Sequence, residues 1–196
     1  MKIHFGGICK DFEALPMKNN PEDAVMFREP SDSRKFALLV NVGAILLMLP
    51  LLVPYFCLGK PYFGDADVAI YTGLIASLIS AIPHEFLHAV CFRKDAGIYL
   101  YPKGNALFVY GMEDMSKTRF IIMNLLPNIV FGWIPYLVFL FHPDMIGLGL
   151  FGLINTGGGF GDYFNVFNAI TQVPANSWIY LAGIHTFWHP KGSTGN

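Results

Sequence analysis

Charged residues are scarce, at 14% of the 196 positions, whereas a typical soluble domain carries about 25%. Hydrophobic residues make up 54% of the chain and aromatic residues 15%, and the mean hydropathy is +0.45. The net charge is −1 at pH 7, and no basic cluster is rich enough to follow a phosphate backbone. The composition therefore argues against nucleic acid as a partner and favours a membrane protein.

Cysteine is also scarce. Cys9, Cys57 and Cys91 are scattered, odd in number and form no C-x-x-C pair, so neither a disulfide framework nor a cysteine-based zinc site is expected. The opening stretch "MKIHFGGICKDFEALP" lacks the apolar core of a signal peptide, so insertion is expected to depend on the first spanning segment.

What the chain does have is long apolar runs. Four are long enough to cross a bilayer, which takes about 20 residues: 36–58, 68–92, 120–141 and 145–170. We predict an all-α multi-pass membrane protein with about four transmembrane helices, the first kinked by Pro50 and Pro54. Residues 1–35 are predicted to form a loosely structured cytoplasmic arm, residues 36–170 the membrane domain, and residues 171–196 an interfacial tail.

The 13 Lys and Arg residues are unevenly distributed. Six lie in the arm, five between the second and third apolar segments, and one in the tail, whereas Lys60 alone lies between the first and second. Because basic residues accumulate on the cytoplasmic side, this distribution predicts a cell-membrane protein with both termini in the cytoplasm.

The loop between the second and third apolar segments contains "GIYLYPKGNALFVYG". Two β-prone runs, residues 98–101 and 106–110, flank the turn-forming residues "PKGN". We therefore expect a short β-hairpin at the membrane surface.

The stretch "AIPHEFLHAV" places His84, Glu85 and His88 inside an apolar segment. Residues four apart project from nearly the same helix face, and this is the H-E-x-x-H pattern, in which two imidazoles bind Zn²⁺ and the glutamate acts as general base. An ionisable residue in a membrane helix costs about 2.5–3.5 kcal/mol, which a bound metal can offset. The alternative is a set of polar residues that bridge helices.

A catalytic zinc ion needs a third protein ligand, and Asp162 is the best candidate. His84 and Asp162 each lie seventeen residues from the outer start of their segments, at residues 67 and 145, which places both about 25 Å deep. The glycines before Asp162 are expected to permit close helix approach or local unwinding, although Asp162 can instead cap a helix end.

Other polar residues allow further hypotheses. Asn155 and Asn165 flank the site and either bind substrate or tie helices together. Pro83 removes a helical hydrogen bond to Ile79 and either opens the backbone or makes an ordinary kink. Glu113 and Asp114 are expected to cap the third helix, and His185 and His189 to lie in an interfacial aromatic patch.

"HEFLH" and "NTGGGFGD" together resemble the two motifs of the site-2 protease superfamily of intramembrane zinc metalloproteases. The closest likeness is to a smaller membrane family described as "putative zincin peptidases", whose members pair "HE..HA" with a late "GGD"-like element. The chain departs from the protease pattern in having Tyr163 after Asp162, where that pattern has glycine, and in lacking the prolines of the second motif.

The resemblance implies a zinc metalloendopeptidase that cleaves a membrane-associated protein or peptide near the cytoplasmic boundary. His84, His88 and Asp162 would bind Zn²⁺ and Glu85 would be the catalytic residue, while the hairpin would offer a strand edge to an extended substrate. Two alternatives stay open: a catalytically silent relative that binds membrane segments, and a membrane protein that binds or transports metal without hydrolysis.

Overall fold

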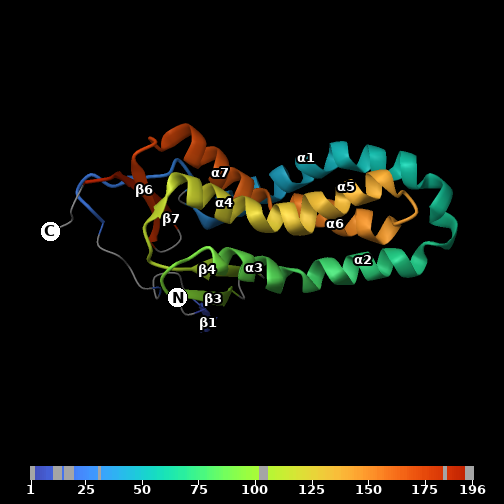
Figure 1. The fold of residues 1–196 in the computed structure, drawn as a ribbon, viewed down its shortest axis with the longest axis horizontal. Coiled ribbons are helices and arrows are strands. Elements are labelled where there is room, and N and C mark those ends of the chain that lie inside the picture. Colours follow the sequence, from blue (N-terminus) through green and yellow to red (C-terminus); the bar gives the residue numbers. More distant parts are fainter. Residues whose placement is uncertain are drawn as a thin grey trace. The chain divides into compact units, whose positions relative to one another are not determined.

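The computed structural model describes residues 3–10, 15, 20–30, 32–101, 106–182 and 185–192 (Figure 1). The helices are α1 (Ser33–Gly59), α2 (Asp67–Ile79), α3 (Ala81–Val90), α4 (Lys117–Pro127), α5 (Ile134–Phe141), α6 (Ile146–Gly158) and α7 (Phe160–Gln172), with a 3-10 helix η2 (Lys60–Asp65) and a π-helix η4 (Asn128–Trp133). The strands are β1 (Ile3–Ile8), β2 (Val25–Met26), β3 (Ala96–Tyr101), β4 (Ala106–Tyr110), β5 (Met115–Ser116), β6 (Ser177–Ala182) and β7 (His185–Pro190).

The chain divides into two compact units. Unit 1 comprises Met1–Glu29, Glu85–Asn124 and Asn165–Asn196, and unit 2 comprises Pro30–His84 and Leu125–Phe164. All seven strands of the described residues belong to unit 1, and most of the apolar helices belong to unit 2. One boundary between the units lies between Glu29 and Pro30, and the other three fall within α3, α4 and α7, so these helices contribute residues to both.

Helix α6 is the centre of unit 2, because it packs against α1, α2 and α5. A Cβ atom added to Gly73 would overlap the carbonyl oxygen of Gly147, so α2 and α6 touch backbone to backbone. Small residues allow this approach, which is the usual way for helices to associate in lipid. Tyr136 and Phe139 are almost fully buried in the core beside α6.

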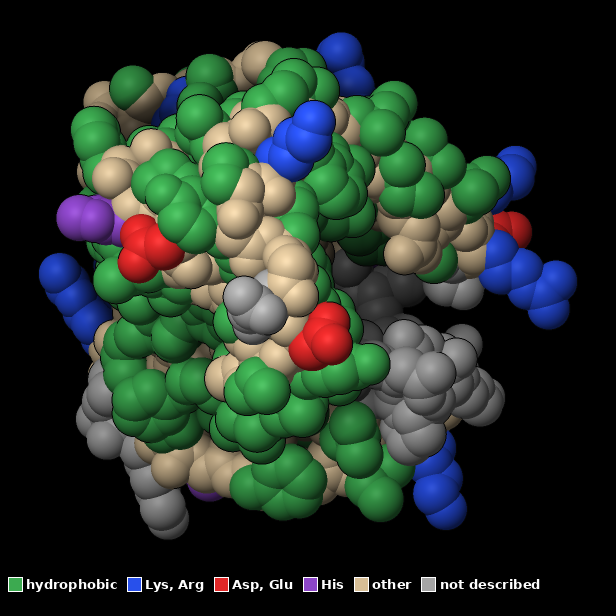
Figure 2. All heavy atoms as spheres, turned by 90° about the vertical axis from the view of Figure 1, so that its right-hand side faces the viewer, with side chains coloured by type: hydrophobic (Ala, Val, Ile, Leu, Met, Phe, Trp, Pro, Cys, Tyr) green, Lys and Arg blue, Asp and Glu red, His purple; other side chains and the backbone are tan. Residues whose placement is uncertain are grey.

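Three helical segments are long and apolar enough to cross a membrane: Arg34–Gly64, Asp67–Val90 and Lys117–Phe141. They correspond to the first three predicted spans, and Pro50 and Pro54 lie inside the first. In the first of these segments, Arg34–Gly64, only 6% of an 18-residue apolar stretch is buried. Figure 2 shows hydrophobic side chains over most of the visible face, with few charged groups.

The fourth predicted span is not one continuous helix. Helix α6 ends at Gly158 and α7 begins at Phe160, so the apolar helix here covers only Ile146–Gly158. The interruption falls in the glycine run, where each residue weakens a helix by about 1 kcal/mol. The local unwinding that the sequence suggested therefore occurs just before Asp162.

The predicted hairpin is confirmed. Strands β3 and β4 pair antiparallel, while the predicted turn at residues 102–105 lies outside the described residues. The all-α prediction is incomplete, because β1 pairs in parallel with β3 and gives a three-stranded sheet ordered β1-β3-β4. The arm expected to be loosely structured thus supplies a strand, since its residues find hydrogen-bonding partners about 90 positions later in the chain.

A second sheet, ordered β2-β7-β6-β5, includes two segments of the tail, β6 and β7. Strands β6 and β7 form an antiparallel hairpin, and β2 from the arm pairs with β7. Phe27, Met115 and Ile179 are buried in the core beside this sheet. His185 and His189, expected in an aromatic patch, lie on β7, where His185 contacts the Glu29 carboxylate at 3.0 Å.

Glu113 does not cap α4 as expected. Its carboxylate accepts hydrogen bonds from the backbone amides of Arg93 and Lys94, at 2.6 and 2.9 Å, just after α3 ends. The Arg119 guanidinium contacts the same carboxylate at 2.6 Å and donates to the carbonyl of Cys91 at 2.7 Å. Burial alone would raise the pKa of Glu113, but the bond from Arg119 and those from the Lys94 and Arg93 amides outweigh it and lower the pKa to about 2. The carboxylate is therefore ionised, and it fixes the chain at the end of α3.

We expect Glu113→Gln to destabilise unit 1 by about 2 kcal/mol at pH 7, since hydrogen bonds to a charged group are lost and Arg119 loses its counter-charge. Because the folded-state pKa lies below the ordinary value of 4.5, the stabilisation is present above that value and is lost as the pH falls toward 2. Thermal unfolding in detergent from pH 7 to pH 2.5 measures both effects. The exposed Glu22→Gln serves as control, and equal stability of Glu113→Gln and wild type would contradict the assignment.

Candidate metal centre

The helix that carries the H-E-x-x-H residues begins just after a one-residue interruption between two helices. Helix α2 ends at Ile79 and α3 starts at Ala81, with Pro83 in its first turn. Proline has no N–H, so Pro83 cannot donate to the carbonyl of Ile79. Regular bonding resumes at His84, whose N–H donates to the Ser80 carbonyl at 2.9 Å.

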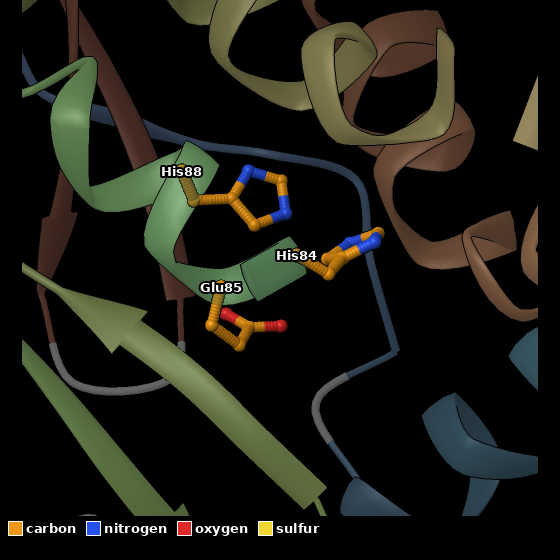
Figure 3. A group of neighbouring side chains, drawn as sticks. All are labelled: His84, Glu85 and His88. Carbon is orange, nitrogen blue, oxygen red and sulfur yellow. The ribbon is translucent and has the colours of Figure 1, made fainter. Parts of the chain in front are cut away.

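His84, Glu85 and His88 extend from the same side of α3 (Figure 3). Each offers one ligand atom, and these atoms all lie within 4.8 Å of one another. Since the three residues share about one helical turn, the helix itself sets this geometry. His88 is buried, at 7% exposure, and the other two are half-buried. The arrangement is a group of ligand side chains that can hold a metal ion.

His88 is oriented by a backbone carbonyl. Its Nδ1 lies 2.9 Å from the carbonyl oxygen of Met123 in α4. A carbonyl can only accept, so Nδ1 carries the proton and Nε2 keeps its lone pair for a metal. The residue four positions after Met123 is Pro127, which has no N–H to donate to that carbonyl. The sequence thus leaves the Met123 oxygen available to the imidazole.

Asp162 lies in the first turn of α7. Its Oδ2 is 3.2 Å from Nε2 of His84, a residue 78 positions earlier in the chain. Both side chains are largely buried, at 16% and 15% exposure. The N-terminal end of a helix favours a negative charge, so the break before Phe160 also stabilises the carboxylate. The structure therefore places Asp162 beside His84, as predicted from the equal number of residues that separates each from the start of its segment.

The spacing of these two atoms suits a shared metal. Two ligands on a tetrahedral zinc ion, each about 2.0–2.1 Å from it, stand about 3.3 Å apart, and His84 Nε2 and Asp162 Oδ2 are 3.2 Å apart. Two imidazole nitrogens and a carboxylate oxygen form a donor set that zinc accepts in catalytic sites, with a fourth position left for water or substrate. The chemistry of these donors thus suits zinc, and the spacing of His84 and Asp162 is that of two ligands of one ion.

Sequence reasoning missed two residues of the π-helix η4. The Asn128 side chain donates from Nδ2 to Asp162 Oδ2 at 2.6 Å, and the Trp133 indole donates to the Tyr163 hydroxyl at 2.9 Å. The available signal was an asparagine in an apolar segment, where an unsatisfied amide is costly. Residue spacing alone could not identify the partners of Asn128 and Trp133, because η4 departs from the α-helical repeat.

The two asparagines predicted to flank the site make hydrogen bonds within their own helix or to other segments. The Asn155 amide donates to the Phe151 carbonyl at 2.9 Å, and its Oδ1 lies 2.8 Å from the hydroxyl of Ser80 at the break before α3. The Asn165 amide donates to Asn124 Oδ1 at 3.1 Å. Substrate binding by Asn155 and Asn165 stays a prediction.

Comparison with known proteins is consistent with a metal site at these residues. No curated protein and no solved structure matches the chain. A family model described as "Putative zincin peptidase" matches residues 77–178, just over half of the chain. The matched range includes the helix that carries His84, Glu85 and His88, the β3–β4 hairpin, and Asp162. The chain therefore belongs to the family described as "putative zincin peptidase".

Proposed function

We propose that this protein is a zinc-dependent endopeptidase of the site-2 protease type, which hydrolyses a peptide bond of a membrane-associated substrate near the cytoplasmic boundary. His84, His88 and Asp162 hold the metal, and Glu85 is the catalytic residue. The observation that carries the proposal is the 3.2 Å approach of Asp162 to His84, since a lone H-E-x-x-H helix lacks the third ligand that catalytic zinc needs.

Each residue has a distinct task. A bound Zn²⁺ supplies Lewis-acid polarisation of the scissile carbonyl and acidifies the attacking water. Glu85 accepts a proton from that water and returns it to the leaving amine. His84 and His88 act as neutral ligands, and the Met123 carbonyl accepts from Nδ1 of His88, so Nε2 is the nitrogen that would bind the metal. Asp162 adds a negative charge that balances part of the charge of the metal.

The β-hairpin supports a peptide as substrate. In the described sheet ordered β1-β3-β4, strand β4 lies at one edge. An extended peptide can add to such an edge through main-chain hydrogen bonds, which also holds the substrate out of the helical conformation that shields its amides. This favours a protein or peptide over a small-molecule substrate.

A membrane location is part of the proposal. Three segments have the length and composition of membrane spans, and α6 with the first turn of α7 would complete the fourth crossing. Twelve of the 13 Lys and Arg residues would then lie on one side, so we place both termini in the cytoplasm.

Asp162→Ala is expected to lower zinc affinity by at least about 100-fold, because one of three protein ligands is lost. His84→Ala should have an effect at least as large. Zinc content and chelator competition on the purified full chain in detergent measure both. Asp144→Asn, in the turn before α6, is the carboxylate control, and full zinc affinity in Asp162→Ala would remove Asp162 from the ligand set.

Glu85→Gln separates an enzyme from a silent or purely metal-binding relative. The substitution keeps the shape of the side chain but removes the base, so zinc affinity should change little while cleavage falls about 100- to 10,000-fold. Mass spectrometry of model membrane peptides incubated with each variant detects the products. Equal cleavage by wild type and Glu85→Gln would contradict the mechanism, and zinc binding without any cleavage by wild type would favour the silent relative.

Pro127→Ala tests how His88 is oriented. Alanine restores an N–H that can donate to the Met123 carbonyl and compete with His88 Nδ1. We expect zinc affinity to fall by up to about tenfold, although removing proline from a helix otherwise tends to stabilise it. Pro50→Ala in α1 is the matched control, since it adds an N–H far from this imidazole in the sequence. Unchanged zinc affinity in Pro127→Ala would show that Met123 does not orient the ligand.

A further inference from the structure

Asn128 is the first residue of the π-helix η4, and it is fully buried, at 0% exposure. Its amide donates to Asp162 Oδ2 at 2.6 Å. This oxygen is also the one that lies 3.2 Å from His84 Nε2. A short hydrogen bond to a carboxylate is among the stronger neutral–charged contacts in a protein, so the amide fixes how the Asp162 carboxylate is turned.

The neighbouring Gly159 leaves space for this amide. It lies between α6 and α7 with φ −78° and ψ 12°, a conformation open to any residue, so the backbone does not require glycine. A Cβ atom at this position would overlap Oδ1 of Asn128. Gly158 and Gly161 differ, because a Cβ atom added to either has no neighbouring atom within 4 Å. Within the glycine run, the space beside Asn128 is thus a requirement specific to Gly159.

A second hydrogen bond ties the same two segments together. Trp133, the last residue of η4, donates to the Tyr163 hydroxyl at 2.9 Å. The first and last residues of η4 therefore bind the consecutive residues Asp162 and Tyr163. With both residues tied, the first turn of α7 has little freedom to rotate the carboxylate away from His84.

We propose that Asn128 is a positioning residue that orients the Asp162 carboxylate toward the metal, and that Gly159 is required to leave room for the Asn128 amide. The inference deepens the proposed function and rests on it, because Asp162 must be a ligand. Partners that orient metal ligands from behind typically change metal affinity by 10- to 100-fold when they are lost. Asn128 acts through Asp162 and does not itself touch the metal.

The test is a double-mutant cycle on zinc affinity in the full chain. Asn128→Ala and Gly159→Ala should each weaken zinc binding by about 10- to 100-fold. If the alanine at 159 acts by displacing the Asn128 amide, the double variant should bind zinc about as well as Asn128→Ala alone. The absorption spectrum of bound Co²⁺ provides a second readout, because it reports ligand geometry, and it should change in both single variants.

Matched controls separate this role from a general loss of packing. Gly158→Ala and Gly161→Ala add the same methyl group nearby and should keep zinc affinity within about twofold. Thr156→Val alters another fully buried polar side chain of unit 2 and should leave the Co²⁺ spectrum unchanged.

The outcomes distinguish the two proposals. Wild-type zinc affinity in Asn128→Ala, or fully multiplicative effects in the double variant, would overturn the positioning role and leave the proposed function standing. If Asn128→Ala does not fold, the zinc affinity of Gly159→Ala is compared with that of Gly161→Ala. Equal zinc affinity in this pair would overturn the positioning role. A wild-type chain that binds no zinc would overturn the proposed function, and the positioning role with it.

Discussion

The contact between His84 and Asp162 is the interaction on which the rest of the candidate site depends, because it joins residues 78 positions apart. Each side of this contact lies just after an interruption of a helix. Pro83 accompanies the break between α2 and α3, and the glycine run separates α6 from α7. An unbroken helix keeps its backbone groups bonded to one another and offers no charged terminus. The interruption before α7 places Asp162 at a helix N-terminus, which stabilises its charge. The interruption before α3 provides a turn that orients His84.

The same principle extends to the residues behind the ligands. Pro127 leaves the Met123 carbonyl available to His88, and the π-helix that follows begins with Asn128, which binds Asp162. A proline and the π-helical segment after it thus position two of the proposed ligands from one stretch of chain. Polar groups placed in apolar helices are costly unless they are satisfied. Here the backbone irregularities provide the partners, so the sequence departs from regular helix formation where the candidate site requires it.

Prediction from sequence succeeded where a local rule or a simple count applied. The four-residue spacing of His84 and His88 gives a shared helix face, and the hairpin β3–β4 has its turn residues between two adjacent strands. Counting residues from the outer ends of two segments placed Asp162 near His84. Prediction failed where two strands remote in sequence pair with each other. The parallel pairing of β1 with β3 and the pairing of β2 with β7 leave no periodic signal in either segment. Asn128 was missed for a related reason, since the π-helix shifts the phase from which a facing residue would be inferred.

Tyr163 stands where the site-2 protease pattern has glycine, and its contacts indicate whether this difference affects the candidate metal centre. Glycine at that position would remove the hydrogen bond that the Tyr163 hydroxyl accepts from Trp133 and would leave the bond from Asn128 to Asp162. The tyrosine is therefore compatible with a fixed Asp162 and does not count against the metal centre. What changes is the side chain that follows the carboxylate in sequence, since a phenol stands where the site-2 pattern has a hydrogen atom. The bond from Trp133 and the contact to His84 use different side chains of the same turn, so the proposed ligand geometry does not require glycine after Asp162. The tyrosine therefore bears on the space left for the proposed substrate, and the proposed set of metal ligands does not depend on it.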